Sequence, residues 1–180
     1  MDKLGKRSAI EARKIGEYWE RQFCILGFKH GKAFTAHQWG RKEKAALFYI
    51  PGLNPLTLPD ITIWSAPGEH HEIKHKTTNQ HGCYGLEDYR LLALEKFARE
   101  TKQFVYYTIH DWKLAGAESA DQITENNIEH WRFMNVLYMR KNITKSGNEQ
   151  ETFYNGKYVK KLIHYWEADL FAPLKVLWNG

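Results

Sequence analysis

The sequence has few cysteines and no long apolar segment. Cys24 and Cys83 are its two cysteines among 180 residues, a usage that indicates a reducing compartment and predicts a cytoplasmic protein. No apolar run approaches the roughly 20 residues that a membrane-spanning helix needs, so we expect no membrane partner. The polar N-terminus lacks the apolar stretch of a signal peptide. The sequence also has no glycine-rich phosphate loop, no nucleophile elbow and no internal repeat.

The composition is that of a globular protein. Hydrophobic residues make up 43% of the chain and aromatic residues 14%, and the length suits one domain with a sizeable core. Because we find no linker, we expect a single domain over residues 1–180. The formal charge of +5 and the pI of about 9.1 favour a phosphate-bearing partner, although basic proteins that bind no nucleic acid are also common.

The first predicted element is a helix from Ser8 to about Gly27. Ser8 and Glu11 form a capping box, in which each side chain satisfies a free backbone amide at the start of the helix. Gly27 is a natural stop. A mostly apolar stripe recurs at helical spacing and comprises Ile15, Tyr18, Trp19, Gln22, Phe23 and Leu26.

The rest of the chain alternates between strands and helices. We predict a strand within Ala45–Ile50, a hairpin that starts at Asp60, a helix over about 86–101 and a buried strand over Phe104–Ile109. The apolar stripe of the second helix is Leu86, Tyr89, Ala93 and Phe97. Further on we predict a short helix from Ser119 towards His130, a strand over Phe133–Met139 and a hairpin whose turn is Asn155-Gly156.

The hairpin that starts at Asp60 carries the most informative chemistry. Asp60 opens one strand, and Glu72 and Lys74 lie on the next strand, where alternation places them on one face and Ile73 on the other. Two convergent carboxylates can hold a hard divalent cation such as Mg²⁺. A neighbouring lysine can orient a water molecule or stabilise negative charge that develops on a phosphate. These groups are the ones needed to hydrolyse a phosphodiester.

The residues Pro59-Asp60 and Glu72-Ile73-Lys74 resemble the motif of the PD-(D/E)xK, or restriction-endonuclease-like, nuclease superfamily. The order of predicted elements over about residues 8–112 is similar to the core of that family. The resemblance implies an α/β fold with a central mixed β-sheet flanked by helices. Residues 113–180 would add a C-terminal elaboration with extra β structure.

The resemblance also implies roles for individual residues. Asp60, Glu72 and the carbonyl of Ile73 would bind Mg²⁺ or Mn²⁺, and Lys74 would complete the catalytic set with the two carboxylates. Some members of the family, Holliday-junction resolvases among them, carry a metal-site glutamate on the first helix. Glu20 is similar in position, and it is either such a ligand or a solvated glutamate at the edge of the apolar stripe.

Basic residues are the candidates for contacts with DNA. Arg41, Lys42 and Lys44 form one cluster, and Lys76 shares the face of Glu72 and Lys74. Lys76 is either a phosphate contact or a solvated strand end. Histidines on both sides of the hairpin also allow a zinc site, but their spacing matches no zinc motif and strand alternation splits them between two faces.

Two classes of function follow from these patterns. The first is a Mg²⁺-dependent deoxyribonuclease whose site is Asp60, Glu72 and Lys74, acting as a monomer or as a homodimer. The second is a nucleic-acid-binding module that has kept the fold and lost catalysis. An unrelated α/β protein with a fortuitous motif is a third interpretation. The sequence predicts that the first class applies if the three side chains converge.

Overall fold

The computed structural model describes residues 9–37, 47–48, 52–65, 68–154 and 157–178. The described helices and strands follow one another in the order α1 (Ala9–Lys29), β1 (Ala33–Ala36), β2 (Leu47–Phe48), β3 (Leu56–Thr57), β4 (Ile61–Trp64), β5 (Glu69–Lys76), β6 (Cys83–Glu87), α2 (Asp88–Thr101), β7 (Phe104–Asp111), β8 (Trp131–Asn135), α3 (Val136–Lys141), β9 (Lys145–Tyr154), β10 (Lys157–Glu167), β11 (Ala172–Pro173) and α4 (Leu174–Trp178). Single 3₁₀ turns cover Ile128–His130 and Ala168–Leu170.

A six-stranded mixed sheet forms the centre of the molecule, in the order β1-β4-β5-β7-β8-β11. β5 and β7 are parallel, and the other neighbours in this sheet are antiparallel. The connection between β5 and β7 runs through β6 and α2, which is the crossover that a parallel pair requires. β5 therefore lies inside the sheet, with β4 on one side and β7 on the other.

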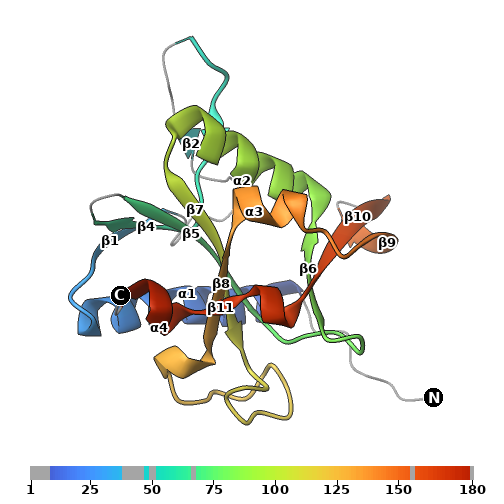
Figure 1. Cartoon of the computed structure of the whole chain (residues 1–180). Helices are drawn as coiled ribbons and strands as arrows, with labels where there is room; N and C mark the ends of the chain where they lie inside the picture. Colours follow the sequence, from blue (N-terminus) through green and yellow to red (C-terminus); the bar gives the residue numbers. More distant parts are fainter. Residues whose placement is uncertain (1–8, 38–46, 49–51, 66–67, 155–156, 179–180) are drawn as a thin grey trace.

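Helices cover both faces of this sheet (Figure 1). α1 buries Trp19, Phe23 and Leu26 against Ile61 and Ile73, together with side chains of the C-terminal helix α4. On the other face, α2 and α3 pack on β7 and β8. That second core contains Leu91, Leu94, Phe97, Val105, Tyr107, Ile109, Val136 and Met139. The side chains of β5 thus alternate between an α1 face and an α2 face.

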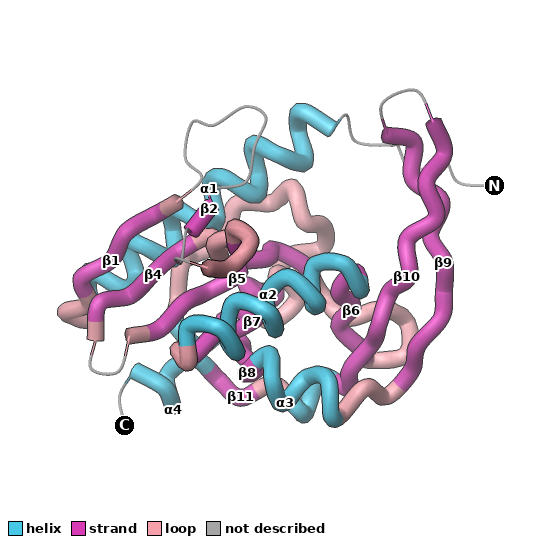
Figure 2. The backbone as a smooth tube through the Cα atoms, turned by 90° about the horizontal axis from the view of Figure 1, so that it is seen from above, coloured by secondary structure: helices cyan, strands magenta, loops and turns pink. Residues whose placement is uncertain are grey.

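A smaller three-stranded sheet, β6-β10-β9, lies beside the end of α2. β9 and β10 form a long antiparallel ribbon that stands out from the body of the molecule (Figure 2). Their register pairs Tyr154 with Lys157, so the predicted Asn155-Gly156 hairpin is confirmed at the level of strand pairing, while the two turn residues lie outside the described part. The buried Trp166 fixes β10 to the core because its indole N–H donates to the carbonyl of Met139 at 2.8 Å.

Most of the predicted elements are present, with some shifts. The first helix extends to Lys29, two residues past the predicted stop at Gly27. The glycine with a positive φ that follows this helix is Gly31, at 70°. β2 falls within the predicted strand, but it pairs with β3 in a two-stranded sheet. The strand next to the β4–β5 hairpin is instead β1, which the sequence did not predict. Ser8 of the predicted capping box lies outside the described residues.

Three predictions were wrong in detail. The second helix begins at Asp88 because the preceding residues form β6 and pair with β10. Residues 119–122 form bends and turns and residues 123–127 have no regular structure, so the predicted helix is absent. At the end of this segment, the side chain of Asn126 donates to the carbonyl of Gln22, and that of Asn127 accepts from the amide of Glu129. The strand predicted to reach Met139 ends at Asn135, whose side chain caps α3 by accepting from the amide of Leu137.

Within the described residues, we find no helix that is both long enough and apolar enough to cross a membrane.

Candidate active site

The hairpin of β4 and β5 brings Asp60 to Glu72 and Lys74. β4 and β5 are antiparallel, with Ile61 opposite His71. Asp60 directly precedes β4, and its Oδ2 accepts a hydrogen bond from the backbone amide of Ile73 at 2.8 Å. That bond holds the Asp60 carboxylate beside the middle of β5. Asp60 is 4% exposed and Glu72 is 0% exposed, so both carboxylates are buried.

Lys74 joins the two acidic residues. Its Nζ donates to Oε1 of Glu72 at 2.5 Å and to the carbonyl of Ile73 at 3.2 Å, and it lies 3.9 Å from Oδ2 of Asp60. The three residues predicted to form a site therefore converge. The carbonyl of Ile73, the predicted backbone ligand, lies at the same place.

Arg90 is a member of this cluster that the sequence did not identify. From the first turn of α2 it donates to Glu72 through Nε, 2.8 Å from Oε1, and through Nη2, 2.5 Å from Oε2. The same Nη2 lies 3.6 Å from Oδ1 of Asp60. Its guanidinium thus lies between the two carboxylates. No local signal in the sequence marks Arg90, because the contact depends on how α2 packs on the sheet.

The surroundings shift the pKa values of the two carboxylates in opposite directions. Burial, followed by the charge of Glu72, raises the pKa of Asp60 to about 7, although Lys74 and Arg90 act against this rise. Burial alone would raise the pKa of Glu72 as well, but Lys74 and Arg90 outweigh it and hold that pKa at about 2. Burial also opposes the charged form of Lys74, yet Glu72 and Asp60 leave its pKa raised. Lys74 and Arg90 therefore favour the ionised form of Glu72, whereas burial and the charge of Glu72 favour the protonated form of Asp60.

Glu20 lies on α1, half-buried at the margin of the apolar face. Its charge contributes to the raised pKa of Asp60, after burial and Glu72, which places it within electrostatic reach of the site. The same charge, after burial, raises the pKa of the buried thiol of Cys24 to about 12. The structure thus brings the charge of a third carboxylate within reach of Asp60.

The donor set suits a hard cation. Asp60, Glu72 and the carbonyl of Ile73 present only oxygen atoms, which is what Mg²⁺ and Mn²⁺ prefer. A cation beside Asp60 would favour its ionised form, which burial now opposes. No group of three or more His, Cys, Asp or Glu side chains is arranged to hold a metal within the described ranges. A zinc cluster among the described histidines therefore has no structural support.

Of the four residues predicted to contact DNA, the structure describes Lys76 alone. Arg41, Lys42 and Lys44 lie outside the described residues. Lys76 shares the α2 face with Glu72 and Lys74, but its ammonium turns inward, where it donates a short hydrogen bond to the carbonyl of Gly85 and lies 5.5 Å from the centre of the Tyr107 ring. Burial, followed by the charge of Lys74, lowers the pKa of Lys76 to about 8. Lys76 is therefore not a freely solvated strand end.

Comparison with known proteins gives a match at the level of structure. No protein-family model matches the sequence, and no curated protein matches it. The fold is similar to that of Hjc, a Holliday junction resolvase from the archaeal hyperthermophile Archaeoglobus fulgidus, with a TM-score of 0.53 and 15% sequence identity over 91% of this chain and 99% of that chain. This likeness assigns the restriction-endonuclease-like fold, as the hairpin motif predicted.

Proposed function

We propose that this protein is a metal-dependent nuclease that hydrolyses phosphodiester bonds in DNA. The observation that carries the proposal is the convergence of Asp60, Glu72 and Lys74 on one hairpin of a restriction-endonuclease-like fold, with Nζ of Lys74 2.5 Å from Glu72 and 3.9 Å from Asp60. The carboxylate pair supplies oxygen ligands, and the lysine supplies the positive charge that a phosphate needs.

Each residue has a distinct role in this proposal. Asp60, Glu72 and the carbonyl of Ile73 would hold Mg²⁺ or Mn²⁺, and Glu20 would act as a second-site or water-bridged ligand. The cation, when bound, activates a water molecule and stabilises charge on the phosphate. Lys74 donates from Nζ to the attacking water or to a phosphate oxygen. Arg90 fixes the orientation of Glu72 through its paired hydrogen bonds.

DNA binding would rest on the basic residues. Arg41, Lys42 and Lys44 precede the hairpin in the sequence and would contact backbone phosphates. Neutralising phosphates with lysine and arginine releases counterions, so affinity falls steeply as salt rises. Replacing these three residues together with alanine should flatten the dependence of affinity on salt concentration. An unchanged slope would remove the segment from the DNA-binding surface.

Arg90 gives one argument for the second class of function. Its guanidinium already contacts both carboxylates, as a bound cation would. A nucleic-acid-binding module without catalysis could use Arg90 in this way as a permanent replacement for the metal. The intact set of Asp60, Glu72 and Lys74 favours the enzyme, because a module that only binds DNA gains nothing from burying two carboxylates.

Cleavage assays test the proposal directly. Purified protein is incubated with duplex, single-stranded, flap and four-way-junction DNA in Mg²⁺, in Mn²⁺ and in chelator. We expect cleavage of at least one substrate with metal and none with chelator. Asp60→Asn protein, prepared in the same way, controls for contaminating nuclease. DNA binding without cleavage of any substrate would support the binding module instead.

A further inference from the structure

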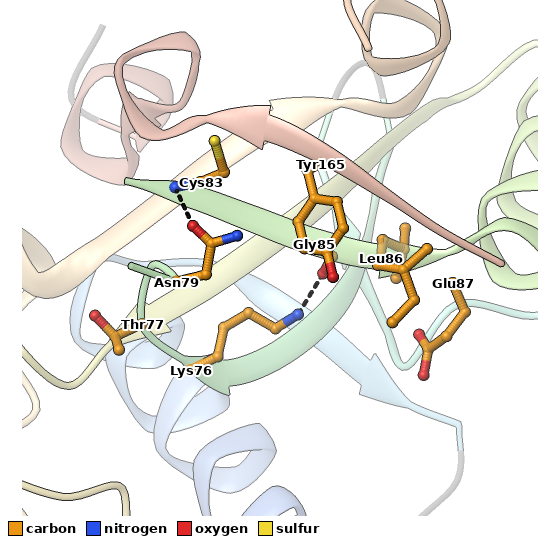
Figure 3. A pocket seen from close by; sticks show the side chains of 9 residues that line it. Lys76, Thr77, Asn79, Cys83, Gly85, Leu86, Glu87 and Tyr165 are labelled. Carbon is orange, nitrogen blue, oxygen red and sulfur yellow. Dashed lines mark hydrogen bonds between the residues drawn. The ribbon is translucent and has the colours of Figure 1, made fainter. Parts of the chain in front are cut away.

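A pocket opens beside the candidate active site, between the end of β5 and the three-stranded sheet. Its volume is about 290 Å³, and Figure 3 shows the side chains around it. Lys76 and Asn79 come from β5 and the connection to β6, Gly85 and Glu87 from β6, and Ile163 and Tyr165 from β10. The consecutive strands β5 and β6 and the distant strand β10 thus build one cavity that the proposed metal site does not use.

The pocket has both hydrogen-bond donors and a hydrogen-bond acceptor among its side chains. Lys76 offers an ammonium and Glu87 a carboxylate. The side-chain oxygen of Asn79 accepts from the backbone amides of His81 at 2.9 Å and Cys83 at 3.1 Å. Because these bonds fix the orientation of the amide, its NH₂ group is held ready to donate. Donors and an acceptor therefore surround one small cavity.

One wall of the pocket is largely apolar and closely packed. Ile163 and Tyr165 lie on β10, and Tyr165 is paired with Gly85 across the strands. A Cβ atom on Gly85 would lie 3.0 Å from Cε1 of Tyr165 and 3.1 Å from Cγ2 of Ile163. Glycine at this position therefore lets the tyrosine ring pack flat against β6. The result is an aromatic surface beside the polar groups.

The charges in the pocket nearly cancel. The carboxylate of Glu87 lies close enough to Lys76 for its charge to act on the ammonium. A phosphate would gain attraction from Lys76 and lose it to Glu87. A neutral heterocycle with N–H donors and carbonyl acceptors would instead gain from both groups. The pocket thus favours a nucleobase over a phosphate, which differs from the phosphate contact predicted for Lys76.

The size and position of the pocket further restrict which ligands could bind there. Sites for drug-sized molecules span about 300–1,000 Å³, so this cavity suits one base and not a base pair. Lys76 follows Lys74 by two residues on the same strand face, a separation of about 6.6 Å. That distance is comparable with the step from one nucleotide to the next. The pocket therefore lies next to Lys74 along the same strand face.

We propose that this pocket binds the base of an unpaired nucleotide adjacent to the scissile phosphate. The inference rests on the proposed nuclease function and specifies its substrate class, namely DNA that is unpaired at the cleaved step. The base edge contacts Glu87 and Lys76, and the base ring lies against Tyr165 and Ile163. A base inside a duplex cannot reach such a pocket without leaving the stack.

Binding measurements without metal test this inference apart from catalysis. Two DNAs of the same sequence are compared by fluorescence anisotropy in chelator, one fully paired and one with a single unpaired cytosine. The wild-type protein should bind the unpaired DNA about tenfold more tightly, on the scale of one base stacked on an aromatic ring. Cytosine is chosen because its amino group can donate to a carboxylate.

Glu87→Gln is the decisive variant. It keeps the size of the side chain and removes a negative charge, so generic attraction to phosphates can only rise. We nevertheless expect affinity for the unpaired DNA to fall by about tenfold, the scale of a hydrogen bond to a charged group, while affinity for paired DNA stays equal or increases. Glu100→Gln is the matched control, since Glu100 is exposed near the far end of α2 and its substitution should leave the preference intact.

The outcomes separate this inference from the proposed function. Equal affinities of the wild-type protein for the two DNAs would overturn the inference, as would a rise in both affinities for Glu87→Gln. Metal-dependent cleavage with no preference for unpaired DNA would keep the nuclease and reject the base pocket. A preference that depends on Glu87, in a protein that never cleaves DNA, would keep the pocket and reject the nuclease.

Discussion

Arg90 donates two hydrogen bonds to Glu72, from Nε to Oε1 at 2.8 Å and from Nη2 to Oε2 at 2.5 Å. The acceptor is fully buried, with an exposed fraction of 0%, and the arginine side chain is 17% exposed. A carboxylate without solvent depends on such donors for its charged state. Arg90 and Lys74 together therefore keep Glu72 ionised in the absence of metal.

The first prediction concerns Arg90→Met. Removing the guanidinium leaves a buried charge short of its main partner, so the metal-free protein should lose about 3–5 kcal/mol of unfolding free energy. A divalent cation can replace the missing positive charge. Mg²⁺ or Mn²⁺ should therefore raise the melting temperature of Arg90→Met more than that of the wild type. Thermal unfolding with and without metal measures both effects.

Arg13→Met controls for the loss of an arginine. Arg13 pairs with Glu17 on the exposed side of α1 at 2.8 Å, and exposed pairs of this type contribute roughly 0.2–1 kcal/mol. The control should unfold almost like the wild type and show the same response to metal. If metal stabilises Arg90→Met no more than it stabilises the control, Arg90 does not share a site with the cation.

The sequence predicted the hairpin site because its signals are local. The turn chemistry and strand alternation are contained within residues 60–74, and they suffice to place Glu72 and Lys74 on one face. Arg90 was missed because its role depends on the docking of α2 against the sheet, a contact that no local pattern encodes. The start of α2 was misplaced for a similar reason, since pairing with β10 holds Leu86 in a strand.

Tyr89 shows the same limit at a single position. Helical spacing placed it in the apolar stripe, but it is 57% exposed, while Leu91 and Leu94 are buried. With two strand residues wrongly included in the helix, the inferred face was rotated. β1 and β6 are short strands that depend on partners far along the chain, and such strands carry little periodic signal of their own.

The second prediction concerns pH and Asp60. Because its pKa is raised in the folded protein to about 7 from a model value of 3.8, the folded state keeps a proton that the unfolded chain releases. This contribution to stability is fully present below about pH 3.8 and is lost as pH rises through about 7. Asp60→Asn removes it. The difference in melting temperature between the wild type and Asp60→Asn should therefore fall as pH rises from about 4 to 8 in chelator.

The comparison between the two proteins is essential because buried histidines titrate in the opposite sense. Burial lowers the pKa of His70, His71 and His110, so their contribution to stability increases as pH rises towards the normal histidine pKa. These groups are common to the wild type and Asp60→Asn and largely cancel in the difference. A difference that is flat with pH would contradict the raised pKa of Asp60.

The third prediction concerns Glu20. Its charge reaches Asp60, so a cation bound at the hairpin should also feel it. Glu20→Gln should weaken Mn²⁺ binding by roughly three- to tenfold, the range for losing one nearby charge at a partly solvated position. Titration calorimetry measures this. Glu17→Gln, one turn away on the same helix, is the control and should bind Mn²⁺ like the wild type. If the two variants bind Mn²⁺ with equal affinity, Glu20 does not contribute to the metal site.

The last prediction separates the roles of the hairpin residues. Asp60→Asn and Glu72→Gln keep the side-chain size but remove an anionic ligand, so metal affinity and DNA cleavage should fall together. Lys74→Ala removes a positive charge that lies 2.5 Å from Glu72 and 3.9 Å from Asp60. Metal should therefore bind this variant as tightly as the wild type or more tightly.

Turnover by Lys74→Ala should nevertheless drop by about 100-fold or more, as when a donor to transition-state charge is removed. Calorimetry with Mn²⁺ and single-turnover cleavage on the same preparations supply the two readouts. Lys96→Ala, at an exposed position on α2, controls for the loss of a lysine and should match the wild type in both. If Lys74→Ala keeps full turnover, or loses metal affinity and turnover in the same proportion as Glu72→Gln, then Lys74 serves only to hold Glu72 in place and the water-activating group must lie elsewhere.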